Sequence, residues 1–538
     1  MAPFTRYLKK ALPILLCFTF AGLAASCVLL SQHYRARARA AENALSIDRS
    51  RATAERAGRI SSQEKTYIRA LAERYGISLR ESVTIRDAVT VAARMNQDLN
   101  LNVPAEYSTA KTPWLPPPPK TLKSRDFPDG KRVPFSLEKG VIALEGEPKL
   151  YHYSISNDTG SEVPMPILYK GLRWDDAEKL VESAGLRGIS DEVDRAVAVW
   201  RFVAQHRYHA MPVTEGAEEH DTVKFFSCYG YGFCDDAAQA VAGIARLCGL
   251  QARIWSLSGN VHVVSEIFAA GRWILLDADF AVYFHKTGDP RTILGVEELA
   301  QDRTAFRNAI QCGRLPGFEH EYAAYFQDRV GNKEWKVEVR SDYRIAATLK
   351  PGEKVVFSNF NWGSYFFGAY PQRVPRYFNG YFDRPIEPEM FVAPKGVEIR
   401  RDSGAFTIAN STTEDQMVEL FVEYPFPIVG GVFKSTASVQ MEFEDRHFGR
   451  KIQLKAGRDV ALDSAVTRVN KQPTTSYVLR IFVAAGGLIK FDRIPHLITD
   501  FQFAELPLLR LKNGDNEFQI HTPAPETLSG LTGEVSWK

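Results

Sequence analysis

The amino-acid sequence predicts an α+β protein with an N-terminal membrane helix, a helical stalk, a mixed region of helices and strands, and antiparallel β domains at the C-terminal end. Three observations predict this order. An uncharged apolar run lies near the N-terminus, helix-forming residues dominate 41–99, and short alternating apolar runs dominate after about 340. With 538 residues, the chain is too long for one compact core.

Composition and charge exclude several classes of protein. The chain is 45% hydrophobic and 24% charged, which excludes disordered and collagenous proteins, and six cysteines are too few for a disulfide framework. The first 40 residues carry six basic residues and no acidic one, whereas the rest of the chain has 61 basic and 64 acidic residues. The net charge of +3 therefore comes from the N-terminus, and we expect no nucleic-acid partner.

The segment from Ala11 to Ser31 contains no charge and has cations on both sides. At 1.5 Å per residue it is long enough to cross the hydrocarbon core of a bilayer. We interpret 1–40 as an uncleaved signal-anchor. A cleaved signal peptide and a lipoprotein signal ending at Cys27 are the alternatives. We then expect the globular part to be exported, to the periplasmic face of a bacterial inner membrane.

The next segments follow from proline content and strand signals. Residues 41–103 are predicted to form a helical stalk, because no proline occurs between Pro13 and Pro104. Eight of the 29 prolines fall from Pro104 to Pro134, which predicts a linker at 104–135. Residues 340–538 are predicted to form one or two β-sandwich-like domains, which leaves a mixed domain at 136–335.

The most informative residues lie between 229 and 280. A helix is predicted over 237–247, opened by the residues around Cys234 and ended by Gly249. Two acidic residues directly after Cys234 suit a first helical turn, so Cys234 is expected at the N-terminus of the helix, where the dipole stabilises a thiolate. An earlier helix is predicted with Ser190 as its cap.

Three strands are predicted after this helix, beginning at Gln251, His262 and Arg272, with a tight turn at 269–271. In an antiparallel hairpin closed by that turn, His262 and Asp277 fall at the same open end. A thiol can therefore meet a histidine and a carboxylate, as nucleophile, base and orienting group. A neighbouring imidazolium lowers the pKa of a thiol, and backbone amides near Cys234 are expected to stabilise an oxyanion.

Residues 165–300 resemble the transglutaminase-like superfamily, a papain-like fold found in transglutaminases, bacterial proteases, amidases and some non-catalytic scaffolds. The resemblance lies in Gly-Phe-Cys234 followed by an Ala-rich helix, then His262-x-x-x-Glu266, then Gly-Arg-Trp273-x-x-x-Asp277. It implies that 136–335 is a transglutaminase-like domain with Cys234 as nucleophile, His262 as base and Asp277 as orienting residue. It also implies acyl chemistry on amides.

Several neighbouring residues have alternative interpretations. Asp279 lies on the same face of an extended strand as Asp277 and competes for the orienting role, whereas a structural ion pair is expected for Glu266. Tyr229, Tyr231 and Gly232 are expected to line the substrate cleft. Cys228 is either a free loop thiol or a modulator that pairs with Cys234 in an oxidising compartment.

The remaining candidate residues are assigned no chemistry. Cys248 lies in an apolar run and is expected in the core, and Cys312 has no evident partner. Metal binding by His206 and His209 is not expected, because no further ligand completes a site. We expect neither a metal nor a cofactor.

The sequence therefore supports two hypotheses. The first is a membrane-anchored cysteine enzyme acting on protein or peptide amides, with hydrolysis favoured over cross-linking because no second amine site is evident. The second is a non-catalytic scaffold whose β domains dock polysaccharide, peptidoglycan or a protein partner in the cell envelope. An aromatic cluster at 362–370 is a candidate for that docking, with a β-sheet core as the alternative.

Overall fold

The computed structural model describes residues 123–127, 130–209, 220–258, 262–311, 322–323, 325–326, 331–359, 378–402, 404–446, 449–463, 465–466 and 474–538. Every described residue belongs to the unit Met95–Lys538. The predicted membrane segment, the stalk, most of the proline-rich linker and the aromatic cluster at 362–370 lie outside the described residues. Within the described part of the chain, no helix is long and apolar enough to cross a membrane.

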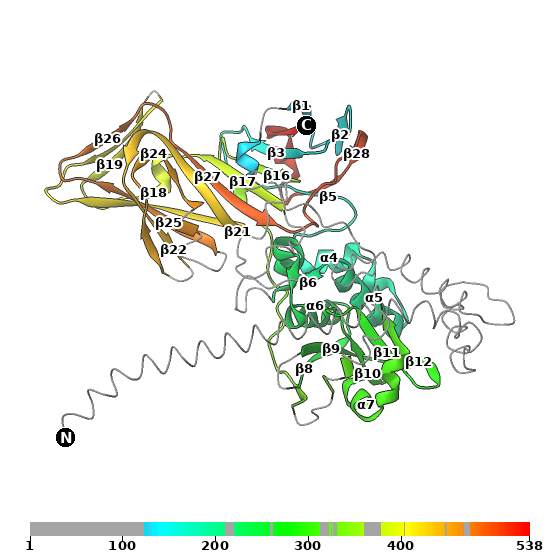
Figure 1. Ribbon diagram of the computed structural model, residues 1–538. Helices are drawn as coiled ribbons and strands as arrows, with labels where there is room; N and C mark the ends of the chain where they lie inside the picture. Colours follow the sequence, from blue (N-terminus) through cyan, green and yellow to red (C-terminus); the bar gives the residue numbers. More distant parts are fainter. Residues whose placement is uncertain are drawn as a thin grey trace, which may run out of the picture. The chain divides into compact units, whose positions relative to one another are not determined.

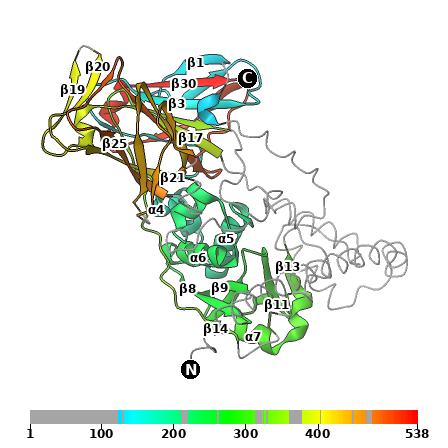
Figure 2. The same ribbon diagram turned by 60° about the vertical axis from the view of Figure 1, so that its left-hand side comes forward.

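The described chain is mixed and mostly antiparallel β, with few helices (Figures 1 and 2). Its largest element is a sheet of 12 strands. In spatial order the strands are β1 (Lys131–Phe135), β30 (Leu531–Trp537), β3 (Tyr151–Asn157), β16 (Lys354–Ser358), β17 (Phe378–Pro385), β27 (His496–Phe503), β21 (Gln416–Val439), β25 (Thr474–Val483), β22 (Met441–Asp445) and β23 (Lys451–Gln453). Two more strands, β18 (Phe391–Val392) and β24 (Gly457–Ala461), pair with β21.

Four smaller sheets accompany the large one. They are β2 (Val141–Leu144) with β28 (Gly514–Glu517), β4 (Val163–Pro164) with β15 (Thr348–Leu349), β5 (Ile167–Tyr169) with β29 (Gln519–His521), and β19 (Val397–Asp402) with β20 (Ala405–Asn410) and β26 (Leu488–Phe491). Strands from 131–169 thus pair with strands from 348–358 and 514–537. These pairings join strands across the domain boundaries predicted at 136 and 335.

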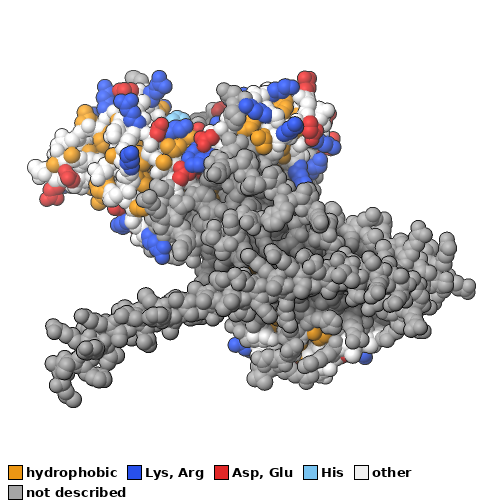
Figure 3. Space-filling model, in the orientation of Figure 1, with side chains coloured by type: hydrophobic (Ala, Val, Ile, Leu, Met, Phe, Trp, Pro, Cys, Tyr) orange, Lys and Arg blue, Asp and Glu red, His pale blue; other side chains and the backbone are white. Residues whose placement is uncertain are grey.

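The core of this β-rich part is built from alternating and aromatic residues. Strand β20 alternates between half-buried and buried positions, the period expected of a strand with one face in the core. The rings of Phe382 and Tyr424 stack with centroids 3.9 Å apart, and Phe426 stacks on Phe501 at 4.8 Å. Figure 3 shows basic and acidic side chains interspersed over the described part of one face, as the balanced composition of the body predicts.

The mixed region contains the helices α4 (Ala177–Ser183), α5 (Glu192–Gln205) and α6 (Cys234–Leu247) and the π-helix η3 (Lys224–Tyr229). Its sheet has the order β10 (Arg272–Leu276), β9 (His262–Ala269), β8 (Gln251–Leu257) and β14 (Lys333–Glu334), and α6 packs against β8 and β9. Beside it are β11 (Val282–Lys286), β12 (Asp289–Ile293), β13 (Ala309–Gln311), α7 (Val296–Gln301) and the short parallel pair β6 (Tyr208–His209) and β7 (Tyr231–Gly232).

The local predictions for this region are confirmed, with one difference in a helix cap. Helix α6 ends at Leu247, and Gly249, two residues later, has a φ of +78°, the left-handed value expected of a terminating glycine. The β9–β10 turn has Ala270 and Gly271 at positive φ, as a tight hairpin requires. Helix α5 is capped by Asp191, which accepts a hydrogen bond from Asp194 N, rather than by Ser190 as predicted.

The large sheet leads to a test of its packing at Gly380 in β17. A Cβ added there would overlap the Val356 carbonyl and lie 2.5 Å from the Phe501 ring, whereas a Cβ at exposed Gly188 meets nothing within 4 Å. We predict that Gly380→Ala lowers the free energy of unfolding by about 1–3 kcal/mol, measured by chemical denaturation. The control Gly188→Ala is expected to change it by less than about 0.5 kcal/mol. Equal effects of the two substitutions would contradict this packing.

Candidate active site

Cys234 is the first residue of α6, so the predicted position at a helix N-terminus is the one observed. The first amides of a helix have no acceptor within it, and here Asp236 accepts the Phe233 N–H at 2.8 Å, which fixes the entry of the chain into α6. A Cβ on Gly232 would lie 2.6 Å from Asp236 Cγ, so only glycine fits before this turn. The Cys234 thiol is free and half-buried.

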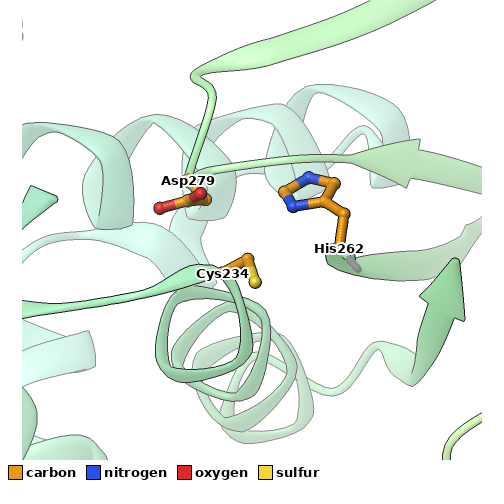
Figure 4. Close-up of side chains that lie close together, drawn as sticks. All are labelled: Cys234, His262 and Asp279. Carbon is orange, nitrogen blue, oxygen red and sulfur yellow. The ribbon is translucent and has the colours of Figure 1, made fainter. Parts of the chain in front are cut away.

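His262 is the first residue of β9 and is 2% exposed. Its Nε2 lies 2.7 Å from Asp277 Oδ2, and the Phe280 and Tyr325 rings lie 4.5 and 4.9 Å from the imidazole. Because Asp277 engages Nε2, the ring nitrogen that remains to face a thiol is Nδ1. Figure 4 shows the imidazole close to Cys234 at the start of its helix.

Asp277 follows β10 and is fixed by both its backbone and its carboxylate. Its N–H and carbonyl exchange hydrogen bonds with Val282, and its carbonyl also accepts the Trp200 indole N–H at 2.8 Å. Its Oδ1 accepts the Phe280 N–H at 2.9 Å, and its Oδ2 accepts the Tyr322 hydroxyl at 2.8 Å. The carboxylate is therefore buried, fully hydrogen-bonded and aimed at His262.

The electrostatics of the pair favour a protonated imidazole. Burial alone would lower the pKa of His262, but the charge of Asp277 and the hydrogen bond to it outweigh burial. Together with the neighbouring Cys234 thiol, they raise the pKa of His262 to about 10. At neutral pH an imidazolium therefore lies beside the thiol.

The segment from residue 182 to residue 278 matches the family model of the transglutaminase-like superfamily. This transglutaminase-like segment contains Cys234, His262 and Asp277, and it lies within the 165–300 range of the resemblance seen in the sequence. Comparison with curated proteins gave no match.

Among solved structures, the chain is similar to carbohydrate-binding modules of family 29. One of them, a mutant complexed with mannohexaose, is 14% identical with a TM-score of 0.16, over 22% of this chain and 85% of that one. Another, complexed with cellulohexaose, is 12% identical with a TM-score of 0.15, over 23% of this chain and 90% of that one. At TM-scores this low, the likeness says nothing about the fold or ligand of this chain.

Asp279, the competitor for the orienting role, is also in the site but has another partner. Its carboxylate pairs with Arg207 at 2.7 Å, and both side chains are almost fully buried. Arg207 also donates to the carbonyl oxygens of Gly232 and Ala278, at 3.1 Å each. Arg207 thus ties the loop before the nucleophile to the loop that carries both aspartates, whereas the Asp277 carboxylate lies 2.7 Å from His262 Nε2.

The site also has a donor set that a metal ion can use. One ligand atom each of Cys234, His262 and Asp279 lies within 4.8 Å of the other two, and sulfur, nitrogen and oxygen together suit Zn²⁺ (Figure 4). The same proximity is what a nucleophilic thiol and its base require, and Arg207 already neutralises Asp279. A chelator is therefore a necessary control in any assay of the thiol.

The other predicted site residues have these positions. Tyr229 is buried in η3, and the side chain of Tyr231 lies outside the described residues. Cys228 is a free, buried thiol that contacts the Pro425 carbonyl, and burial raises the pKa of Cys228, which disfavours the thiolate needed for disulfide exchange. Glu266 pairs with Arg253 at 2.6 Å, the structural ion pair expected from the sequence.

Three residues that support the site were not predicted as site residues: Arg207, Trp200 and Tyr322. Trp200 lies in α5, and its ring packs edge-on against Tyr283. No spacing rule would have linked Arg207 or Tyr322 to Asp277 and Asp279, because they meet only in the folded transglutaminase-like segment and its neighbours.

The buried Arg207–Asp279 pair gives a direct prediction. Arg207→Met leaves a buried carboxylate without its cation, and we expect the free energy of unfolding to fall by about 3–5 kcal/mol. The double variant Arg207→Met, Asp279→Asn removes the stranded charge and is expected to be more stable than the single variant. Chemical denaturation of the three proteins measures this. A double variant less stable than Arg207→Met would contradict the assignment.

Proposed function

We propose that this protein is a transglutaminase-like cysteine enzyme that cleaves amide or peptide bonds through Cys234, His262 and Asp277. The observation that carries the proposal is the 2.7 Å contact between His262 Nε2 and Asp277 Oδ2, beside a half-buried thiol at a helix N-terminus. A nucleophile-bearing helix packed on an antiparallel sheet that carries base and carboxylate also supports the papain-like fold implied by the family resemblance.

The chemistry proceeds in two steps. The Cys234 thiolate attacks the amide carbonyl carbon, and a C–S bond forms while backbone amides at the start of α6 stabilise the oxyanion. Protonated His262 gives its proton to the leaving amine as the C–N bond breaks, which leaves a thioester. Neutral His262 then takes a proton from water, the water oxygen attacks the thioester, and the C–S bond breaks to release the acid and the thiolate.

Hydrolysis is favoured over cross-linking, because water is the only acceptor that this site requires. Asp277 stabilises the imidazolium and keeps Nε2 engaged, so that Nδ1 faces the thiol. The substrate class is a protein or peptide. The uncharged segment from Ala11 to Ser31 supports the further proposal that the protein is anchored to a bacterial inner membrane with its globular part exported.

The main test is alkylation of Cys234 in the full chain at graded pH, with a chelator present and peptide mass spectrometry to locate the label. Cys234 is expected to react near neutral pH, because the imidazolium beside it stabilises the thiolate. In His262→Ala the labelling is expected to be lost or to shift to higher pH. Cys248→Ser is the matched control, because that thiol is buried elsewhere.

The rival function is a non-catalytic scaffold or binding module in the cell envelope. A scaffold has no need of a reactive thiol, so an unreactive Cys234 under reducing conditions would favour it and would contradict the enzyme proposal. Equal labelling of Cys234 in the wild type and in His262→Ala would likewise remove the role proposed for His262.

The carboxylate is tested separately by Asp277→Asn. An amide keeps the shape of the side chain but removes the charge that holds His262 protonated, and its NH₂ favours the wrong tautomer. We predict that the labelling rate of Cys234 at neutral pH falls by about 10-fold or more, because the imidazolium loses the charge that stabilises it. Asp279→Asn, which changes the carboxylate paired with Arg207, is expected to have the smaller effect. The reverse order would assign the orienting role to Asp279.

A further inference from the structure

The side chain of Tyr322 extends the line of hydrogen-bonded groups behind the thiol. Its hydroxyl donates to Asp277 Oδ2 at 2.8 Å, and the same oxygen lies 2.7 Å from His262 Nε2. Cys234, His262, Asp277 and Tyr322 therefore form one continuous series.

Core packing sets the direction of the Tyr322 hydroxyl. The residue is 0% exposed, and its ring lies 4.9 Å from Phe284 and 5.9 Å from Phe326. The Phe280 ring, which also covers His262, lies 5.8 Å from the Tyr322 ring. Because these rings fix the phenol, its hydroxyl stays on Asp277 in a region from which water is excluded, where a hydrogen bond to a charge is strongest.

Asp277 Oδ2 bonds both His262 Nε2 and the Tyr322 hydroxyl. The hydroxyl therefore changes how strongly this oxygen attracts the imidazolium. Hydrogen bonding to a carboxylate stabilises its charged form and spreads the charge over its donors. The attraction between Asp277 and the imidazolium is therefore weaker with Tyr322 in place than it would be without it. His262 must keep its proton in the resting enzyme and then donate it to the leaving amine, so a weaker attraction to Asp277 favours that proton transfer.

Other charged and titratable groups around His262 have separate roles. Cys234 faces the imidazole from α6, and Asp279 approaches from the loop after β10 but is paired with Arg207. The Tyr325 ring packs against the imidazole at 4.9 Å. Asp277 is the carboxylate hydrogen-bonded to the imidazole, and Tyr322 is the side-chain hydroxyl that donates to that carboxylate.

We propose that Tyr322 is a positioning residue whose hydroxyl, bonded to Asp277 Oδ2, weakens the attraction of that carboxylate for the imidazole proton. This inference rests on the proposed cysteine chemistry, and it adds a fourth residue to the three implied by the family resemblance. The influence of Tyr322 on Cys234 would pass through Asp277 and His262, the residues to which its hydroxyl is linked.

The test is the pH dependence of Cys234 labelling by a neutral disulfide reagent, with the full chain in detergent. As the pH rises, the labelling rate first changes when the thiolate–imidazolium pair forms. It changes a second time when His262 loses its proton, because the thiolate then loses its counter-ion. We expect Tyr322→Phe to move the second change to higher pH by about half a unit. A second change that stays in place or moves to lower pH would overturn the proposal.

A matched control separates this effect from the loss of any buried tyrosine hydroxyl. Tyr424 in β21 is also fully buried and donates to a carboxylate, Glu353 Oε1, at 2.6 Å. Tyr424→Phe removes the same group from the large sheet and is expected to leave the pH profile of Cys234 unchanged. If both variants shift the profile equally, the effect belongs to general stability and the proposal fails.

A second substitution keeps the test decisive if Tyr322→Phe does not fold. A fluorinated tyrosine at position 322 keeps the ring in place and makes the hydroxyl a stronger donor, so the second change is expected to move to lower pH. A shift to higher pH would contradict the proposal. The proposed function fails separately, if Cys234 of the wild-type protein does not react at all.

Discussion

The hydrogen bond between His262 Nε2 and Asp277 Oδ2 is the contact on which the arrangement of the site depends. It depends on the register of β9 and β10, in which Leu276 lies opposite Ser265, so that His262 and Asp277 both lie at the open end of the hairpin. Asp277 is then held from four directions, by Val282, Trp200, Phe280 and Tyr322. These contacts hold the carboxylate beside the imidazole, where the charge of Asp277 and the hydrogen bond to it raise the pKa of His262.

The loop before the nucleophile depends on a different set of contacts. The π-helix η3 precedes it, and the Ser227 carbonyl accepts the Ala504 N–H at 2.9 Å, while Cys228 contacts the Pro425 carbonyl. Gly230, at a φ of +67°, lets the chain turn directly against Ala504. Residues of the strand-rich part therefore fix the approach to Cys234, and Arg207 then ties Gly232 to the loop that carries Asp277.

Local signals made the elements of the site predictable. The start of α6 at Cys234, its end before Gly249 and the turn at Ala270 and Gly271 follow from charges, glycines and periodicity within a few residues. The cap of α5 was misplaced by one residue because Ser190 and Asp191 are both good caps, and the sequence contains no rule that ranks neighbours. His262 and Asp277 could be paired because one hairpin joins them.

Contacts between distant segments were beyond the sequence. Strand β3 pairs with β30 and β16, so residues near 150 enter a sheet with residues near 355 and 535. Alternation identifies a strand but not its partner, which is chosen by the packing of the whole core. Arg207 and Tyr322 could not be predicted as site residues for the same reason, because the partner of a buried arginine or tyrosine is set by the packing of segments distant in the sequence.

The most direct test of the central claim is the ultraviolet absorbance of the thiolate, followed against pH in the wild-type protein and in Cys234→Ser. An ordinary thiol ionises near pH 8.5, so the difference between the two proteins separates a free cysteine from an ion-paired one. The raised pKa of His262 predicts an absorbance difference between the two proteins at neutral pH, because an imidazolium stabilises a thiolate beside it. A thiolate that forms only above about pH 8.5 in the wild-type protein would contradict the ion pair and the function built on it.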